Sequence, residues 1–189
     1  MAQYLTEELT STLENNIGTV LDVREQLLKS TGVDLLSNDT LSNIMIQKVV
    51  RKYDQHFEVN MARNGEDART ESIFDMELKT ATLQKHKRGD SYPVATFQFH
   101  AMGDLEHGSY LFAVRDKTTL KIVSIYDIRI SNNVKTVESR LQELSDDWYE
   151  KAQITKTKYD VISVNETFLK ENIQLHMKEI DGVKVYRDY

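Results

Sequence analysis

The segment from residue 73 to residue 80 alternates between two kinds of side chain, and this pattern limits the fold more than any other feature. One side would carry Phe74, Met76, Leu78 and Thr80, and the other Ile73, Asp75, Glu77 and Lys79. A period of two is typical of a β-strand that packs one face on a core. The sequence therefore predicts a strand at 73–80 in which Glu77 and Lys79 share a face.

A second short strand is predicted just upstream, which would make the segment a hairpin. Asp67, Ala68 and Arg69 precede three polar residues, 70–72, at which the chain can turn back. Such a hairpin would bring Asp67 beside Glu77, which follows ten residues later.

Two neighbouring carboxylates indicate a divalent cation. Each disfavours the charged form of the other, and a hard ion such as Mg²⁺ relieves that repulsion. Lys79 would lie over a water molecule or a phosphate oxygen as a positive point charge, an arrangement typical of phosphodiester cleavage. Asp67, Glu77 and Lys79 are therefore the candidate catalytic residues. Asp75 is either a further ligand or a surface acid, and a Glu-x-Lys pair also occurs on ordinary solvated strands.

The composition limits the class of protein. The chain has 189 residues, of which 40% are hydrophobic, and this length predicts a single domain over 1–189. It has no cysteine, which fits a reducing compartment and leaves oxygen and imidazole as the strong metal ligands. The N-terminus lacks the pattern of a signal peptide and no apolar run has the length of a membrane span. We therefore expect a cytoplasmic protein without a membrane partner.

The net charge of −6 argues against unspecific binding to a polyanion. A local basic cluster can still bind phosphates, and Lys85, Lys87 and Arg88 form one just past the predicted strand. We expect these three residues to contact a phosphate backbone. The alternative is an ordinary solvated loop.

The other hydrophobic patterns predict an α/β fold with a mixed central sheet flanked by helices. Helices are predicted at 4–28, or as two helices broken near Gly18, at 41–53, and over 134–148. Strands are predicted at 56–59, 94–100, 109–115, 120–127 and 159–164, and a closing hairpin at 174–186 turns at Asp181-Gly182.

The order of Asp67, Glu77, Leu78 and Lys79 resembles the core motif of the PD-(D/E)xK nucleases, and among them the PvuII-type restriction endonucleases. The resemblance extends to Gly65-Glu-Asp-Ala, Leu111-Phe-Ala-Val, Ile125-Tyr126, Asp147-Trp148 and the segment 173–186. It follows the order and rough spacing of the family over most of the chain.

The resemblance implies a restriction-endonuclease-like core at 33–189 after an N-terminal helical arm at 1–32. It implies a Mg²⁺-dependent, sequence-specific type II endonuclease that cuts double-stranded DNA to leave 5′-phosphate and 3′-hydroxyl ends. The metal ligands would be Asp67, Glu77 and the Leu78 carbonyl. It further implies a homodimer, with the arm as a candidate interface, and a cognate DNA methyltransferase as genetic partner. The alternatives are a repair or phage nuclease that recognises DNA structure, and a noncatalytic regulatory or scaffold protein.

The positions that match DNA-contacting parts of the family are Asn38, Asp39, Asn43, Gln98, His100 and Asn172. The alternative for Asn38 and Asp39 is that they only cap the next helix. Gln98 can contact adenine and His100 a guanine edge, where the family carries a run of histidines. The alternative there is an exposed strand face above a core of phenylalanines, and Asn172 is otherwise a plain turn residue.

Overall fold

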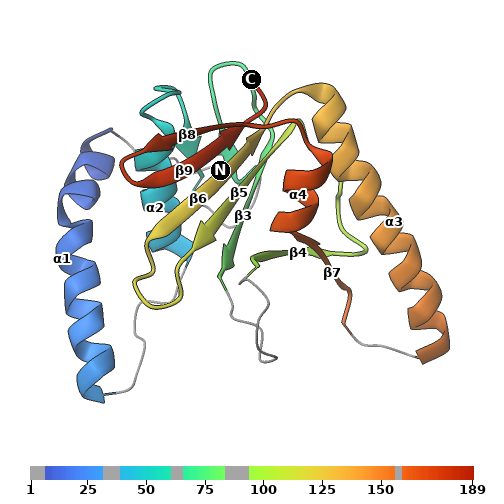
Figure 1. Ribbon diagram of the computed structural model, residues 1–189, viewed down its shortest axis with the longest axis horizontal. Coiled ribbons are helices and arrows are strands. Elements are labelled where there is room, and N and C mark those ends of the chain that lie inside the picture. The colour runs from blue at the N-terminus through green and yellow to red at the C-terminus, as the bar shows by residue number, and fades with distance from the viewer. Residues whose placement is uncertain (1–6, 32–38, 61–65, 84–93, 156–158) are drawn as a thin grey trace.

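The computed structural model describes residues 7–31, 39–60, 66–83, 94–155 and 159–189. These segments form a mixed seven-stranded sheet flanked by helices and a separate two-stranded sheet, so the predicted α/β class is confirmed (Figure 1). None of the helices in these segments is long and apolar enough to cross a membrane.

The helices are α1 (Glu7–Thr31), α2 (Asp39–Val50), α3 (Ser131–Thr155) and α4 (Glu166–Asn172). The strands of the large sheet are β1 (Glu58–Val59), β2 (Ala68–Arg69), β3 (Met76–Thr82), β5 (Ser109–Arg115), β6 (Ile122–Ile128), β8 (His176–Ile180) and β9 (Val183–Arg187), in the order β1-β2-β3-β5-β6-β9-β8. In this sheet β3 runs parallel to β5 and β6 parallel to β9, whereas the other neighbours are antiparallel.

The middle strand β5 separates two cores. Its residues from Ser109 to Val114 are all buried, which is typical of a strand covered on both faces. Phe112 faces a core built with α3, α4, β4 (Thr96–His100) and β7 (Val161–Asn165). Leu111 and Ala113 face a second core built with α1 and α2. Figure 1 shows the two helix pairs on opposite sides of the sheet.

The long helix α1 packs on its own domain. Leu21 and Arg24 are buried, and Arg24 Nη1 donates to the Thr118 carbonyl, between β5 and β6, at 2.7 Å. The helix continues through Gly18, so the alternative of two helices is wrong. Gly18 costs only about 1 kcal/mol of helix stability relative to alanine, which does not end a helix that packs on a core.

The chain turns earlier than predicted between α2 and β1. α2 ends at Val50 instead of residue 53, because the amides of Lys52 and Tyr53 donate to the carbonyls three residues back, at Val49 and Val50, in a tighter turn. The Asp54 carbonyl in turn accepts the Phe57 amide, so that β1 contains only two residues instead of 56–59.

Two strands begin later than predicted, again because of turns. The Thr70 amide donates to the Ile73 carbonyl, and the Ile73 amide donates to Thr70 Oγ1. These two bonds close a turn, and β3 starts only at Met76. Phe74 lies between the turn and the strand and is 70% exposed, so its predicted place in the core is wrong. β6 starts at Ile122 because Leu120 has a φ of 58° in the preceding turn.

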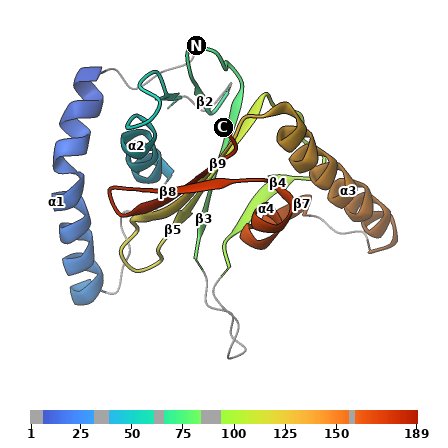
Figure 2. The same cartoon turned by 45° about the horizontal axis from the view of Figure 1, so that its top comes forward.

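The two-stranded sheet, the β4–β7 ribbon, lies on the side of α3 and α4 (Figure 2). Phe97 and Phe99 of β4 face the core, as do Ile162 and Val164 of β7. The outer face consists of the cross-strand pairs Thr96 with Asn165, Gln98 with Ser163, and His100 with Val161. The ribbon therefore presents a mostly polar face to solvent.

The C-terminal part contains one predicted and one unpredicted element. The β8–β9 hairpin turns at Asp181 and Gly182, whose φ values of 50° and 79° suit an Asp-Gly turn, as predicted. The helix α4 was not predicted. Asn165 caps it by accepting the Phe168 amide at 2.8 Å, but seven residues are too few to show a helical period.

Candidate active site

The hairpin of β2 and β3 brings the two predicted acids together. Ala68 pairs with Met76 in antiparallel register, which places Asp67 opposite Glu77. The Leu78 amide donates to Asp67 Oδ2 at 3.0 Å. This bond ties the Asp67 side chain to the backbone of β3, although β2 itself contains only Ala68 and Arg69. The structure thus shows the proximity that the ten-residue spacing predicts.

Lys79 lies on the same face of β3, next to Glu77. Its ammonium forms an ion pair with Glu77 Oε1 and lies 5.1 Å from the centre of the Phe99 ring in β4. The side chains of Glu77 and Lys79 are 16% and 28% exposed, so solvent still reaches both. The ring and the carboxylate together hold the ammonium group beside the acid pair.

The electrostatics of the pair favour a positive ligand. The pKa of the Asp67 carboxyl is raised above its ordinary value, mainly by burial and next by the nearby Glu77. The Leu78 amide and Lys79 oppose this shift without cancelling it. A cation between the two carboxylates would relieve the repulsion that raises this pKa.

The donor set fits a hard cation that keeps part of its water shell. In the described part of the chain, no group of three or more His, Asp or Glu side chains is arranged to hold a metal. Two carboxylates suffice for Mg²⁺, which is often bound through one or two carboxylates together with waters and phosphates. The amide and the carbonyl of a strand residue point to the same side, so the Leu78 carbonyl lies on the side of Asp67.

A groove lies beside Lys79 and extends to the ribbon. It has a volume of about 440 Å³ and is lined by Lys79, Thr80, Ala81, Thr82, Val94, Thr96 and Gln98. Lys79 and Gln98, which lie on different sheets, therefore border the same hollow. Gln98 and His100 are both exposed while Phe97 and Phe99 are buried, so the expected alternation of β4 is confirmed.

Two of the other predicted DNA contacts, Asn43 and Asn172, lie in described helices. Asn43 lies half-buried in α2, beside Ser42, whose hydroxyl accepts a hydrogen bond from Arg115 at 3.2 Å. Asn172 ends α4 and its side-chain amide donates to the Phe168 carbonyl at 2.9 Å, so it is a helix residue instead of a turn residue. Residues 38, 85, 87 and 88 and the side chain of Asp39 lie outside the part that the structure describes.

His107 was missed by the sequence analysis. Its Nε2 lies 3.6 Å from Glu77 Oε2 and its Nδ1 lies 3.2 Å from Asp75 Oδ1. The parallel pairing of Met76 with Ser109 brings it there from thirty residues away along the chain. No local pattern in the sequence predicts such a pairing, so the position of His107 beside Glu77 could not be inferred from the sequence.

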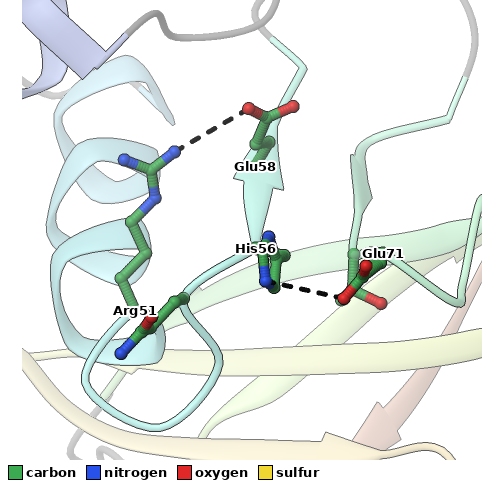
Figure 3. A pocket seen from close by; sticks show the side chains of 6 residues that line it. Arg51, His56, Glu58 and Glu71 are labelled. Atoms are coloured by element: carbon green, nitrogen blue, oxygen red, sulfur yellow. Dashed lines mark ion pairs between the residues drawn. The ribbon is translucent and has the colours of Figure 1, made fainter.

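A second hollow, of about 510 Å³, lies near the end of α2 (Figure 3). Its lining consists of Arg51, Gln55, His56, Glu58, Thr70 and Glu71. The charged groups pair with one another: Glu58 binds both Arg69 and Arg51, and His56 Nε2 lies 3.5 Å from Glu71. Arg51 and Arg69 balance the charges of Glu58 and Glu71, whereas the two carboxylates of the acid pair outnumber the single lysine beside them.

The acid pair, the Leu78 peptide and Lys79 can together bind a divalent cation and place an ammonium group next to it. This combination suits the hydrolysis of a phosphate ester.

A comparison with models of protein families gives no match to this chain, and a comparison with curated proteins gives none either.

Proposed function

We propose that the chain is a Mg²⁺-dependent endonuclease that cuts double-stranded DNA at a specific sequence, with a restriction-endonuclease-like core of the PvuII type. The observation that carries this proposal is the placement of Asp67 opposite Glu77 with Lys79 on the same face of β3. The residues, their order along the chain and their positions on a hairpin agree with the family that the sequence resembles.

Each residue has a distinct role in the proposed reaction. Asp67, Glu77 and the Leu78 carbonyl would hold the cation, which when bound supplies positive charge at the scissile phosphate and makes a nearby water more acidic. Lys79 donates to the attacking water or to a phosphate oxygen, and Phe99 keeps its ammonium in place. The products would carry a 5′ phosphate and a 3′ hydroxyl.

The β4–β7 ribbon supports the reading of a base sequence. A two-stranded ribbon fits the major groove of B-DNA, and its outer face offers Thr96, Gln98, Ser163 and Asn165 as hydrogen-bonding side chains. Gln98 would contact an adenine and His100 a guanine edge. The groove beside Lys79 leads directly to Gln98, so one duplex could reach both the ribbon and the acid pair.

Phosphate contacts and a second subunit complete the proposal. The basic run with Lys85, Lys87 and Arg88 follows the strand that carries Lys79, and we assign it to the DNA backbone despite the net charge of −6. Asn38, Asp39, Asn43 and Asn172 belong to the same proposed interface. Symmetric cutting of both strands of a palindromic site needs two active sites, and a homodimer supplies them. Val23 is 47% exposed on α1, which keeps this helix a candidate interface.

Incubating the protein and Mg²⁺ with several plasmids of known sequence tests the function. We expect discrete, reproducible fragments from the wild type and none from Glu77→Ala or Lys79→Ala, with Lys178→Ala on the exposed strand β8 as a matched control. A smear would indicate a nuclease that recognises DNA structure. No cleavage by the wild type would favour a noncatalytic protein, and wild-type cutting by Glu77→Ala would contradict the assigned site.

A further inference from the structure

Phe99 connects the β4–β7 ribbon to the acid pair. Its ring lies on β4, and the Lys79 ammonium of β3 lies 5.1 Å from the ring centroid, although the two strands belong to different sheets. The face of an aromatic ring attracts an ammonium group at this distance. Phe99 is 5% exposed, so the contact lies at the edge of the core. It joins the proposed catalytic lysine to the strand that is proposed to read bases.

The core beneath the ribbon fixes the Phe99 ring. Its centroid lies 6.1 Å from that of Phe112 and 6.4 Å from that of Tyr110, both on β5 and both in edge-on geometry. Phe99 pairs with Ile162 of β7. Lys79 pairs with Phe112 in the parallel register of β3 and β5, so the lysine leaves its strand beside the ring that supports Phe99. The Phe99 ring is therefore a rigid surface for the ammonium.

The two contacts of the Lys79 ammonium are not equivalent. One is the ion pair with Glu77, whose oxygens are also proposed metal ligands. The other is the Phe99 ring, which is not a metal ligand and is shared with no other charge of the site. In the working site Glu77 divides its charge between two cations, so the ring is the contact that keeps the ammonium in place.

Gln98 faces the opposite way from its neighbour Phe99. It is exposed, and it lines the same groove of about 440 Å³ as Lys79. Side chains alternate along a strand and consecutive Cα atoms are about 3.8 Å apart, so a movement of the backbone at Gln98 carries the Phe99 ring with it. One strand thus holds the proposed base contact on its outer face and the support of the lysine on its inner face.

We infer that Phe99 is a positioning residue for Lys79 and that, through it, β4 couples base recognition to cleavage. When Gln98 meets the base that it suits, β4 holds the ring where the ammonium lies beside the acid pair, whereas a wrong base displaces both. A misplacement of about 1 Å can slow a reaction about 100-fold. The inference rests on the proposed function, in which Lys79 assists the attacking water.

Single-turnover cleavage of a duplex that carries a site mapped from the plasmid fragments tests the positioning role. We expect Phe99→Leu to cut about 10-fold to 100-fold more slowly than the wild type, and to bind the duplex without Mg²⁺ as tightly. Phe97→Leu is the matched control, because Phe97 is buried on the same strand and packs on Phe112 at 4.8 Å, whereas the lysine lies over Phe99. It should cut at close to the wild-type rate.

Combining each variant with Gln98→Ala tests the coupling. Gln98 is adjacent to both phenylalanines in the chain, so proximity alone would affect the two combinations equally. The loss of rate that Gln98→Ala causes at the mapped site should shrink in the Phe99→Leu background and stay unchanged in the Phe97→Leu background. Equal losses in the two backgrounds would overturn the coupling.

Proton NMR of the metal-free protein tests the contact without DNA. Protons over the face of a ring are displaced upfield, so the ε-methylene protons of Lys79, assigned by their loss in Lys79→Ala, should lie upfield of those of solvated lysines. The displacement should vanish in Phe99→Leu and persist in Phe97→Leu. An ordinary shift in the wild type would overturn the inference.

The outcomes separate this inference from the proposed function. A folded Phe99→Leu protein that cuts at the wild-type rate would overturn the positioning role and leave the nuclease proposal intact. A wild type that cuts no DNA would overturn the proposed function and, with it, the role of Phe99. If circular dichroism shows that Phe99→Leu does not fold, Phe99→Met takes its place under the same criterion, because its flexible side chain refills the space.

Discussion

Asp127 binds Arg129 through both oxygens: Arg129 Nε lies 2.8 Å from Oδ1 and Nη2 lies 2.8 Å from Oδ2. This fork at the end of β6 receives further partners, because Arg129 Nη1 donates to Asp54 and the hydroxyls of Tyr53 and Tyr189 donate to Asp127. Asp127 is fully buried. The network joins the turn after α2, the end of β6 and the C-terminal residues.

We expect Arg129→Ala to lower the free energy of unfolding by about 3–5 kcal/mol, because Asp127 would stay buried without its cation. Arg140→Ala, which removes an exposed ion pair with Glu143 on α3, should cost less than about 1 kcal/mol. Urea unfolding followed by circular dichroism measures both values. Equal losses in the two variants would contradict the central role of the buried pair.

Asp67→Asn should stabilise the metal-free protein by about 1 kcal/mol at neutral pH and abolish cleavage. The substitution removes a charge that burial and Glu77 both disfavour, and the carbonyl oxygen of the introduced side-chain amide can still accept the Leu78 amide. Asp22→Asn, on the exposed face of α1, is the control and should change neither quantity. A destabilised Asp67→Asn protein would show that the acid pair is not a source of repulsion.

Glu166 should make stability depend on pH. Burial raises the pKa of its carboxyl, but hydrogen bonds from Lys170 and Tyr126 outweigh burial and leave the pKa below its ordinary value. The carboxylate therefore stabilises the fold above the pKa of an unfolded Glu, about 4.3, and this contribution is lost as the pH falls through the lower folded pKa.

Glu166→Gln should accordingly lower the free energy of unfolding by about 1–2 kcal/mol at pH 7, and by progressively less in acid. Urea titrations from about pH 7 to about pH 3 measure the difference. Glu171→Gln, exposed on the same helix, serves as control. A difference that grows on acidification would contradict the sign of the pKa shift.

Gln98→Ala should relax the preference for one base pair of the cleaved site. A lost bidentate contact costs about 1–3 kcal/mol of discrimination, so digestion of the same plasmids should yield extra fragments, cut at sites that differ at that position. Gln142→Ala, which removes an exposed glutamine from α3, should leave the fragments unchanged. If Gln98→Ala cuts the same sites as the wild type, the proposed role of the ribbon in reading bases is contradicted.

The parts of the fold that the sequence predicts well have local causes. The hairpin of β2 and β3, the pair β5 and β6, the helix α3 and the Asp-Gly turn all follow from periods or turn residues within a short window. The same holds for Asp67, Glu77 and Lys79, which a single hairpin brings together. Their catalytic roles stay predictions.

The parts that the sequence does not predict depend on distant segments. The register of β4 with β7 joins Phe97 to Val164, and that of β3 with β5 brings His107 to Glu77. Such pairings are decided by how the whole chain packs, and a period within one strand does not name its neighbour. The predicted burial of Phe74 was wrong because a turn closed by Thr70 places this residue before the strand begins.

The burial of β5 on both faces links the two cores. Ala113 packs toward α2, whereas the adjacent Phe112 supports Phe97 and Phe99 beneath the ribbon, with ring centroids 4.8 Å and 6.1 Å away. A bulkier residue at the buried Ala113 would press both on α2 and on the backbone that also carries Phe112. Substitutions selected for heat tolerance on the α2 side would therefore shift the β4–β7 ribbon, the proposed recognition surface, and a change in the proposed target choice would accompany the change in melting temperature.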